Sequence, residues 1–195
     1  MLVLGSASPR RRELLGVILP AISFRVISPD VDESVLDEEA PSAYLTRVVR
    51  EKARDISSRV EASERADVSA ILCADTTVVV DGRILAKPGD DAEGTEMLRA
   101  LSGRTHEVGT AFVLAAADGT PLHEETVLTR VTFRAVTARE ITAYVESGEG
   151  RDKAGGYAIQ GGAAPFVARI DGSPSNVVGL PLCELTLALT RLGLT

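Results

Sequence analysis

The chain has 195 residues, 45% of them apolar and 25% charged, which is the composition of a globular protein with a substantial core. Its formal net charge of −7 argues against a protein that binds nucleic acid, because such proteins need a basic surface. The apolar runs are too short to span a bilayer, and the N-terminus lacks the order of a signal peptide, so no membrane association is expected. Cys73 and Cys183 have apolar sequence neighbours, which predicts two buried thiols in a reducing cytoplasm.

The first third of the chain alternates between short strands and helices. The pattern predicts a buried strand at 2–4 and a helix that begins at Pro9, a favourable first residue. A strand at 22–27 follows and leads into an acidic loop at 28–40. A long helix then begins at Pro41, because apolar residues recur there at helical spacing. Residues 58–67 are polar and predict an exposed connection.

The rest of the chain is richer in strands. The most apolar strand is predicted at 68–80, and an Asp-Gly turn leads to a short returning strand. A helix is predicted at 91–101, and two long strands near 107–117 and 122–133. Thr137 can cap a further helix. The remaining predicted segments are an irregular glycine-rich stretch at 148–162, a strand at 166–170 and a C-terminal helix. Strands and helices mix without a regular period, which favours an α/β or α+β fold with a mixed sheet over a Rossmann fold.

The first candidate site is the sequence SASPRRR at 6–12, where a strand ends and a helix begins. Free N–H groups at a helix N-terminus attract phosphate. The hydroxyl of Ser8 and the guanidinium groups of Arg10 and Arg11 would strengthen such a site. The alternative is a serine-capped surface helix with solvated arginines.

Two acidic positions are candidates for catalysis or metal binding. Asp75 lies in the middle of the apolar strand, where a carboxylate is either paired structurally or part of a site. The cluster at 30–33, which includes Glu33, could hold Mg²⁺ or Mn²⁺ through oxygen ligands. The alternative for that cluster is an acidic loop in solvent.

Two lysines could neutralise phosphate. Lys52 falls on the apolar stripe of its helix, where an ammonium group needs an anion or a route to water. The alternative is a side chain that extends along the rim of the core. Lys87 follows the predicted hairpin, which should bring it back close to Asp75; otherwise it is a turn lysine in solvent.

A single amide lies in the glycine-rich stretch at 155–162. Glycines on both sides of Gln160 suggest a backbone that approaches a ligand closely. The Gln160 amide can both donate and accept hydrogen bonds, as the edge of a base requires. The alternative is a flexible surface loop.

These blocks occur in an order that resembles the Maf family of nucleotide pyrophosphatases over essentially the whole chain. The matching stretches are SASPRRRELL, DVDES, REKA, ADTTVVVDG, LAKP, LSGRTHEV, VTFR, DKAGGYAIQGG and NVVGLPL. Gly5 stands where the family usually has alanine. The resemblance implies a single domain over residues 1–195, with a mixed sheet flanked by helices. It also implies the fold of inosine triphosphate pyrophosphatases, elongated with a central cleft.

The resemblance also implies an activity. A member of this family hydrolyses a nucleoside triphosphate to the monophosphate and pyrophosphate with a divalent metal, Mg²⁺ or Mn²⁺, and so removes unwanted nucleotides from the pool. The resemblance is also compatible with a homodimer, and the cysteines favour a cytoplasmic enzyme. The alternative of a different class is a nucleotide-binding regulator of cell division and septum formation, with slow or no turnover.

The implied functional residues carry over position by position. Catalytic roles are implied for four residues, namely Asp75, Glu33, Lys52 and Lys87. Substrate-binding roles are implied for five others, namely Ser8, Arg10, Arg11, Thr76 and Gln160. Glu33 and Asp75 are the best metal ligands available. Asp75 matches the family's proton acceptor, and the sequence leaves open whether it is a base, a metal ligand or both.

Three positions point to a substrate. Arg10, Thr76 and Gln160 resemble the branch of the family that acts on dTTP and UTP, whereas the 7-methyl-GTP branch tends to carry Trp, Gln and Glu there. Uracil and thymine present an N–H between two carbonyls, which one amide can recognise. Arg10 would repel the cationic ring of 7-methylguanine. The same chemistry on 7-methyl-GTP stays an alternative.

Overall fold

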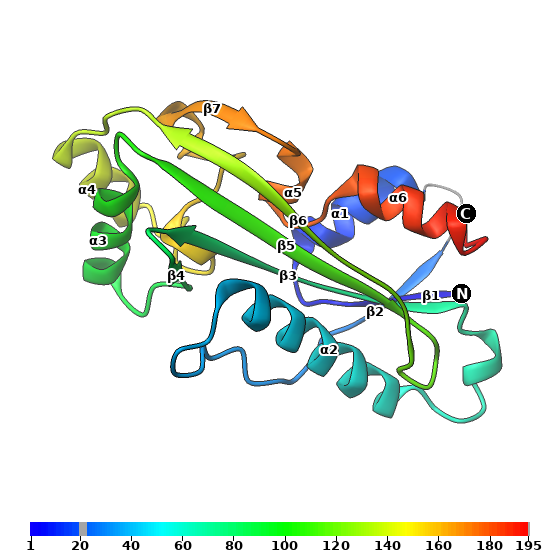
Figure 1. Ribbon diagram of the computed structural model, residues 1–195. Helices are drawn as coiled ribbons and strands as arrows, with labels where there is room; N and C mark the ends of the chain where they lie inside the picture. Colours follow the sequence, from blue (N-terminus) through cyan, green and yellow to red (C-terminus); the bar gives the residue numbers. More distant parts are fainter. Residues whose placement is uncertain (20–22, 195) are drawn as a thin grey trace. The chain divides into compact units, whose positions relative to one another are not determined.

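The computed structural model describes residues 1–19 and 23–194 (Figure 1). The strands are β1 (Leu2–Gly5), β2 (Phe24–Ile27), β3 (Ala70–Val80), β4 (Arg83–Leu85), β5 (Thr105–Ala115), β6 (Pro121–Phe133) and β7 (Val167–Asp171). The sheet has the order β2-β1-β3-β5-β6-β7, and β4 pairs with β3. Strand β1 pairs in parallel with β2 and β3, whereas the β3–β4 and β6–β7 pairs are antiparallel. The predicted mixed sheet is therefore confirmed.

The four helices that the sequence predicts with a starting position begin there. They are α1 (Pro9–Ile18), α2 (Pro41–Arg59), α3 (Asp91–Leu101), α4 (Ala138–Glu146), α5 (Pro174–Val178) and α6 (Leu182–Arg191), with the 3₁₀ turns η1 (Arg65–Asp67), η2 (Ala154–Gly156) and η3 (Ala164–Phe166). Thr137 caps α4 in a reciprocal capping box with Glu140. The short helix α5 was not predicted. The start of the predicted strand at 22–27, Ile22, lies outside the described residues.

The described residues group into two compact units, and β3, β5 and β6 contribute residues to both. Unit 1 consists of Met1–Asp75, Thr110–Val127 and Gly179–Thr195, and unit 2 of Thr76–Gly109 and Leu128–Val178. A single domain over 1–195 stays a prediction.

Unit 1 buries side chains on both faces of its part of the sheet. On one face, α1 and α6 lie side by side (Figure 1). The core there comprises Leu2, Leu4, Leu15, Leu19, Ala70, Leu72, Ala74, Phe112, Leu114, Leu180, Leu185, Ala188 and Leu189. Successive side chains of a strand point to opposite faces. Cys73 and Asp75, one and three residues after Leu72, therefore point to the other face, toward α2.

Unit 2 has its own core, in which α3 and α4 pack together (Figure 1). Its buried residues are Val78, Val80, Leu85, Met97, Leu98, Leu101, Val108, Val131, Phe133, Ile141, Tyr144, Tyr157, Ala163 and Phe166. The buried His106 packs edge-on against Phe133 and Tyr157, and its Nε2 lies 2.8 Å from the Tyr157 hydroxyl. Within the described residues, no helix combines the length and apolarity needed to cross a membrane.

One of the two cysteines departs from the prediction. Cys73 is buried, and burial raises the pKa of its thiol to about 12. Cys183 is exposed, so the prediction of two buried thiols is wrong for it. The reason is its place on α6, four residues before the 52% exposed Leu187 and therefore on the outer face of the helix. Apolar sequence neighbours did not reveal which face it occupies.

Candidate active site

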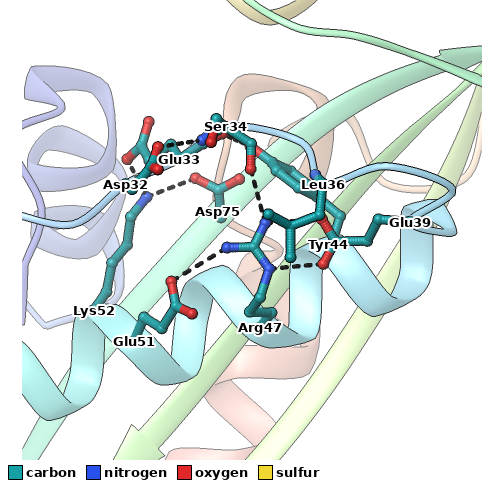
Figure 2. A network of polar contacts seen from close by, with 10 residues as sticks. All are labelled: Asp32, Glu33, Ser34, Leu36, Glu39, Tyr44, Arg47, Glu51, Lys52 and Asp75. Atoms are coloured by element: carbon teal, nitrogen blue, oxygen red, sulfur yellow. Dashed lines mark hydrogen bonds and ion pairs between the residues drawn. The ribbon is translucent and has the colours of Figure 1, made fainter.

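A buried lysine lies between two carboxylates in unit 1 (Figure 2). The side chain of Lys52 on α2 is only 3% exposed. Its Nζ lies 2.6 Å from Oδ1 of Asp75 on β3 and 2.6 Å from Oε1 of Glu33 in the acidic loop. Three segments distant in sequence therefore bring one positive and two negative charges together. Lys52 has the anions that a buried ammonium group requires, so the rim alternative is wrong.

The periodicities of the helix and of the strand explain why Lys52 and Asp75 face each other. Val48, Lys52 and Ile56 follow one another at intervals of four residues, and all three are buried. The same stripe of α2 that fills the core therefore carries Lys52 against the sheet. Asp75 points toward it from β3 because it shares a face with Cys73.

The acidic cluster contributes one carboxylate to this arrangement. Glu33 reaches Lys52 and keeps its side chain 35% exposed. Asp32 turns back instead and accepts a hydrogen bond from the Ser34 amide at 2.8 Å, which lowers the pKa of the Asp32 carboxyl. Asp30 is 94% exposed. Both hypotheses for the cluster, a site residue and an acidic loop in solvent, hold in part. Glu33 enters the candidate site, whereas Asp30 faces solvent and Asp32 contacts the loop itself.

The first motif surrounds the start of α1. Oγ of Ser8 accepts a hydrogen bond from the Arg11 amide at 3.4 Å, so Ser8 does cap the helix. Nε of Arg11 donates to the Gly179 carbonyl at 2.8 Å. Burial lowers the pKa of Arg11, and the carboxylates of Asp75 and Glu33 act in the opposite direction. Arg11 therefore belongs to the electrostatic surroundings of the carboxylates, although the side chains of both Arg10 and Arg11 are partly exposed.

Thr76, Lys87 and Gln160 belong to unit 2. The predicted hairpin is confirmed, because β4 pairs with β3 and Val78 faces Leu85. Lys87 lies two residues beyond Leu85, and Thr76 two residues before Val78. The returning chain thus brings the exposed Lys87 back to the level of Thr76.

The glycine-rich stretch is held by side chains that the sequence did not single out. Oε2 of Glu149 accepts from the Gly162 amide at 2.8 Å, and the Tyr144 hydroxyl accepts from the Ala158 amide at 2.9 Å. A Cβ added at Gly161 would collide with the Glu149 carboxylate. Two hydrogen bonds thus tie the stretch to Tyr144 and Glu149, which argues against the flexible-loop alternative.

The side-chain amide of Gln160 remains available to bind a ligand. Its side chain is exposed and makes no hydrogen bond with any residue that the structure describes. The amide therefore does not brace the loop. A ligand could use both its donor and its acceptor.

The two carboxylates are the candidate metal ligands. No group of three or more His, Cys, Asp or Glu residues in the described ranges is arranged to hold a metal ion. Glu33 and Asp75 nevertheless converge on one cation, the Lys52 ammonium. Mg²⁺ is commonly bound by one or two carboxylates together with substrate phosphates. The pair therefore fits a metal that shares its coordination with a nucleotide.

Comparison with solved structures supports the fold class. The chain is similar to a HAM1 protein from Coxiella burnetii with a TM-score of 0.52 at 17% sequence identity, over 97% of this chain and 98% of that chain. At this identity the likeness concerns the fold alone.

Sequence comparison identifies the family. The model of the Maf family, described as Maf-like protein, matches residues 1–192, so the chain belongs to the Maf family. A dTTP/UTP pyrophosphatase from Myxococcus xanthus is 48% identical over 100% of this chain and 93% of its own length. One from Hahella chejuensis is 46% identical over 99% and 92%. The family resemblance seen in the sequence is confirmed, and with it the expected enzyme class, a nucleoside triphosphate pyrophosphatase.

Proposed function

We propose that this chain hydrolyses dTTP and UTP between the α and β phosphates, giving the nucleoside monophosphate and pyrophosphate with the help of a divalent metal. The observation that carries the proposal is the buried Lys52 between Asp75 and Glu33. Family membership and the relatives named dTTP/UTP pyrophosphatase support it.

The chemistry assigns a task to each charge. Water attacks the α phosphorus, a new P–O bond forms, and the bond to the bridging oxygen breaks so that pyrophosphate leaves with the electron pair. Asp75 orients the attacking water and accepts its proton. Glu33 and Asp75 would hold a divalent metal, which supplies charge neutralisation at the phosphate oxygens when it is bound. Lys52, in contact with both carboxylates, holds them in place.

The departing pyrophosphate needs positive charge. Lys87 and the guanidinium groups of Arg10 and Arg11 are the proposed source of it, together with the free amides at the start of α1. Such interactions accelerate the reaction only if they strengthen as charge moves onto the leaving group. A lysine that acts in this way affects kcat, whereas a residue that only holds the substrate affects KM.

The proposed base specificity rests on Gln160, with Thr76 and Arg10. The exposed Gln160 amide can accept from the N–H of uracil or thymine and donate to a neighbouring carbonyl. Cytosine offers an amino group in place of one carbonyl, and 7-methylguanine carries a positive charge that Gln160 cannot balance. Pyrimidines with two carbonyls should therefore be preferred.

We further propose that the enzyme is a cytoplasmic homodimer that removes unwanted nucleotides and has no nucleic-acid or membrane partner. The net charge of −7 and the two free thiols, Cys73 and Cys183, support this setting. The homodimer rests on the family resemblance. Light scattering of the purified protein tests it, and a monomer at micromolar concentration would contradict it.

A panel of nucleotides tests the function. The purified protein is incubated with dTTP, UTP, CTP, GTP and 7-methyl-GTP in Mg²⁺, in Mn²⁺ and in excess chelator. We expect the highest kcat/KM for dTTP and UTP and no turnover in chelator. Nucleotide binding without turnover would favour the regulator of cell division. A preference for 7-methyl-GTP would overturn the specificity while leaving the enzyme class intact.

A further inference from the structure

The acidic loop that carries Glu33 has little apolar packing of its own. The loop, residues 28–40, contains no helix or strand. Two of its apolar residues, Val35 and Leu36, are exposed, and Val31 is only partly buried. Glu38 has a positive φ of 56°, a left-handed conformation that a residue with a side chain rarely adopts. Polar contacts must therefore hold this segment in its conformation.

One side chain of α2, Arg47, makes three hydrogen bonds to this loop (Figure 2). Arg47 forms a bidentate pair with Glu39, with Nε 2.7 Å from Oε1 and Nη2 2.8 Å from Oε2. Nη2 also donates to the Ser34 carbonyl at 2.8 Å. Nη1 reaches Glu51 on the same helix at 3.3 Å. Arg47 thus holds the loop at two points, one of them directly after Glu33.

Tyr44 adds a contact to Glu33 itself. Its hydroxyl donates to the Glu33 carbonyl at 3.1 Å. Burial, together with the carboxylates of Asp75 and Glu33, raises the pKa of Tyr44, so its hydroxyl stays protonated and able to donate. Tyr44 and Arg47 lie eight and five residues before Lys52 on one helix. The helix that presents Lys52 therefore also fixes the backbone that presents its partner Glu33.

We propose that Arg47 is a positioning residue, which holds the acidic loop on α2 so that the Glu33 carboxylate reaches Lys52 in the active site. The inference rests on the proposed function for its catalytic meaning. A bidentate Arg–carboxylate pair defines an orientation, and a point charge in its place does not. When the tie is lost, Glu33 occupies its place for only part of the time, and the apparent affinity for metal and substrate falls by that fraction.

The same helix offers a matched control. Arg50 forms a bidentate pair with Glu124 on β6, at 2.8 and 2.6 Å, and takes no part in the acidic loop. Arg50→Ala therefore removes an equivalent arginine pair from α2. We expect Arg47→Ala and Glu39→Gln to lower kcat/KM for dTTP about 10-fold. They should also raise the metal concentration for half-maximal activity. Arg50→Ala should change neither. Equal effects of Arg47→Ala and Arg50→Ala would overturn the proposal.

A double substitution separates positioning from general stability. If Arg47 acts through Glu33, then Arg47→Ala should cause no further loss in the residual activity of Glu33→Gln. A full additional loss in that background would show that Arg47 acts by another route and would overturn the proposal. Arg47→Lys should restore little, because a lysine cannot make the bidentate pair.

Amide hydrogen exchange reads the loop without any turnover, so its result is independent of the proposed function. Peptides that cover residues 29–40 should exchange faster in Arg47→Ala than in the unmodified protein or in Arg50→Ala, while the β3 peptide stays protected. Unchanged exchange at 29–40 would overturn the inference even if the protein is a pyrophosphatase. Faster exchange in a protein without turnover would instead place the failure in the proposed function.

Discussion

The Nζ of Lys52 lies 2.6 Å from Oδ1 of Asp75 in the interior of unit 1, where the lysine side chain is almost fully buried. Glu33, at the same distance from Nζ, is more exposed and belongs to a loop. The two carboxylates therefore differ in kind. Asp75 is fixed by a strand, whereas Glu33 depends on contacts to α2. Substitutions at the three positions should separate catalysis from stability.

The Asp75→Asn substitution should lower kcat about 10²-fold or more, because it removes the proposed base and one metal ligand. The fold should survive, since the ammonium group of Lys52 keeps Glu33 as a counter-ion. Steady-state kinetics and circular dichroism check the two parts. Near-normal turnover by a folded Asp75→Asn protein would contradict the catalytic assignment.

Lys52→Ala and Lys87→Ala should both lower kcat more than they raise KM. Lys87 is proposed to stabilise the charge of the leaving pyrophosphate in the transition state, and Lys52 to hold the catalytic carboxylates. Their effects on stability should differ. Lys52→Ala leaves Asp75 buried without its counter-ion and should lower the free energy of unfolding by about 3 kcal/mol. Lys87 is exposed, so its loss should change that free energy by less than about 0.5 kcal/mol. A change in KM alone would make the lysines simple phosphate clamps.

A Gln160→Glu substitution should lower kcat/KM for dTTP and UTP, because a carboxylate cannot donate to a base carbonyl. A loss of about tenfold is expected for one base contact. CTP, which presents an amino group at one of those positions, should lose less. The ratio of kcat/KM values measures the effect, and an unchanged ratio would remove Gln160 from base recognition.

Gly5 and Cys73 should be coupled in stability. They pair across β1 and β3, and a Cβ at Gly5 would collide with Sγ of Cys73 and lie 2.8 Å from Cγ1 of Ile56. Gly5→Ala should therefore lower the free energy of unfolding by about 1–3 kcal/mol. In a Cys73→Ala background the same substitution should cost less, because the sulfur is gone. Urea denaturation of the four proteins gives the coupling, and strict additivity would contradict the contact.

His106 should make the protein sensitive to mild acid. Burial lowers the pKa of His106 to about 4, below its ordinary value of 6.5. The unfolded chain thus takes up a proton as the pH falls through 6.5, while the folded protein resists protonation down to about pH 4. The contribution of the neutral His106 to the free energy of unfolding is complete above pH 6.5. It is lost as the pH falls from 6.5 to about 4, by up to about 3 kcal/mol.

The matched variant for this prediction is His106→Gln, which keeps a polar partner for the Tyr157 hydroxyl. Urea denaturation of both proteins at pH 7, 6 and 5 gives their free energies of unfolding. The carboxylates are the same in both proteins, so their contribution cancels in the difference. The difference in unfolding free energy between the two proteins should shrink as the pH falls. Parallel pH profiles would show that His106 does not titrate in this range.

Local patterns predicted the elements and two of the charged residues well. Pro9, Thr137 and the bounds 91–101 correspond to observed helix starts and ends, because capping and periodicity are properties of neighbouring residues. Asp75 and Lys52 stood out for a related reason. A charge on an apolar stripe must find a partner, even when the sequence does not name it.

Contacts between distant segments could not be predicted in this way. Nothing near Arg47 distinguishes it from Arg50, yet one fixes the acidic loop and the other pairs with β6. Glu149, which holds the glycine-rich stretch, likewise has no local signature. Tyr44 gave one usable signal, its position eight residues before Lys52 on the same face of α2.

The central claim is hydrolysis at the α phosphorus, and phosphorus NMR of dTTP or UTP turnover in ¹⁸O-labelled water tests it most directly. We predict nucleoside monophosphate and pyrophosphate as the primary products, with the isotope shift of ¹⁸O on the monophosphate alone. Orthophosphate and nucleoside diphosphate as primary products, or ¹⁸O in the pyrophosphate, would contradict the account.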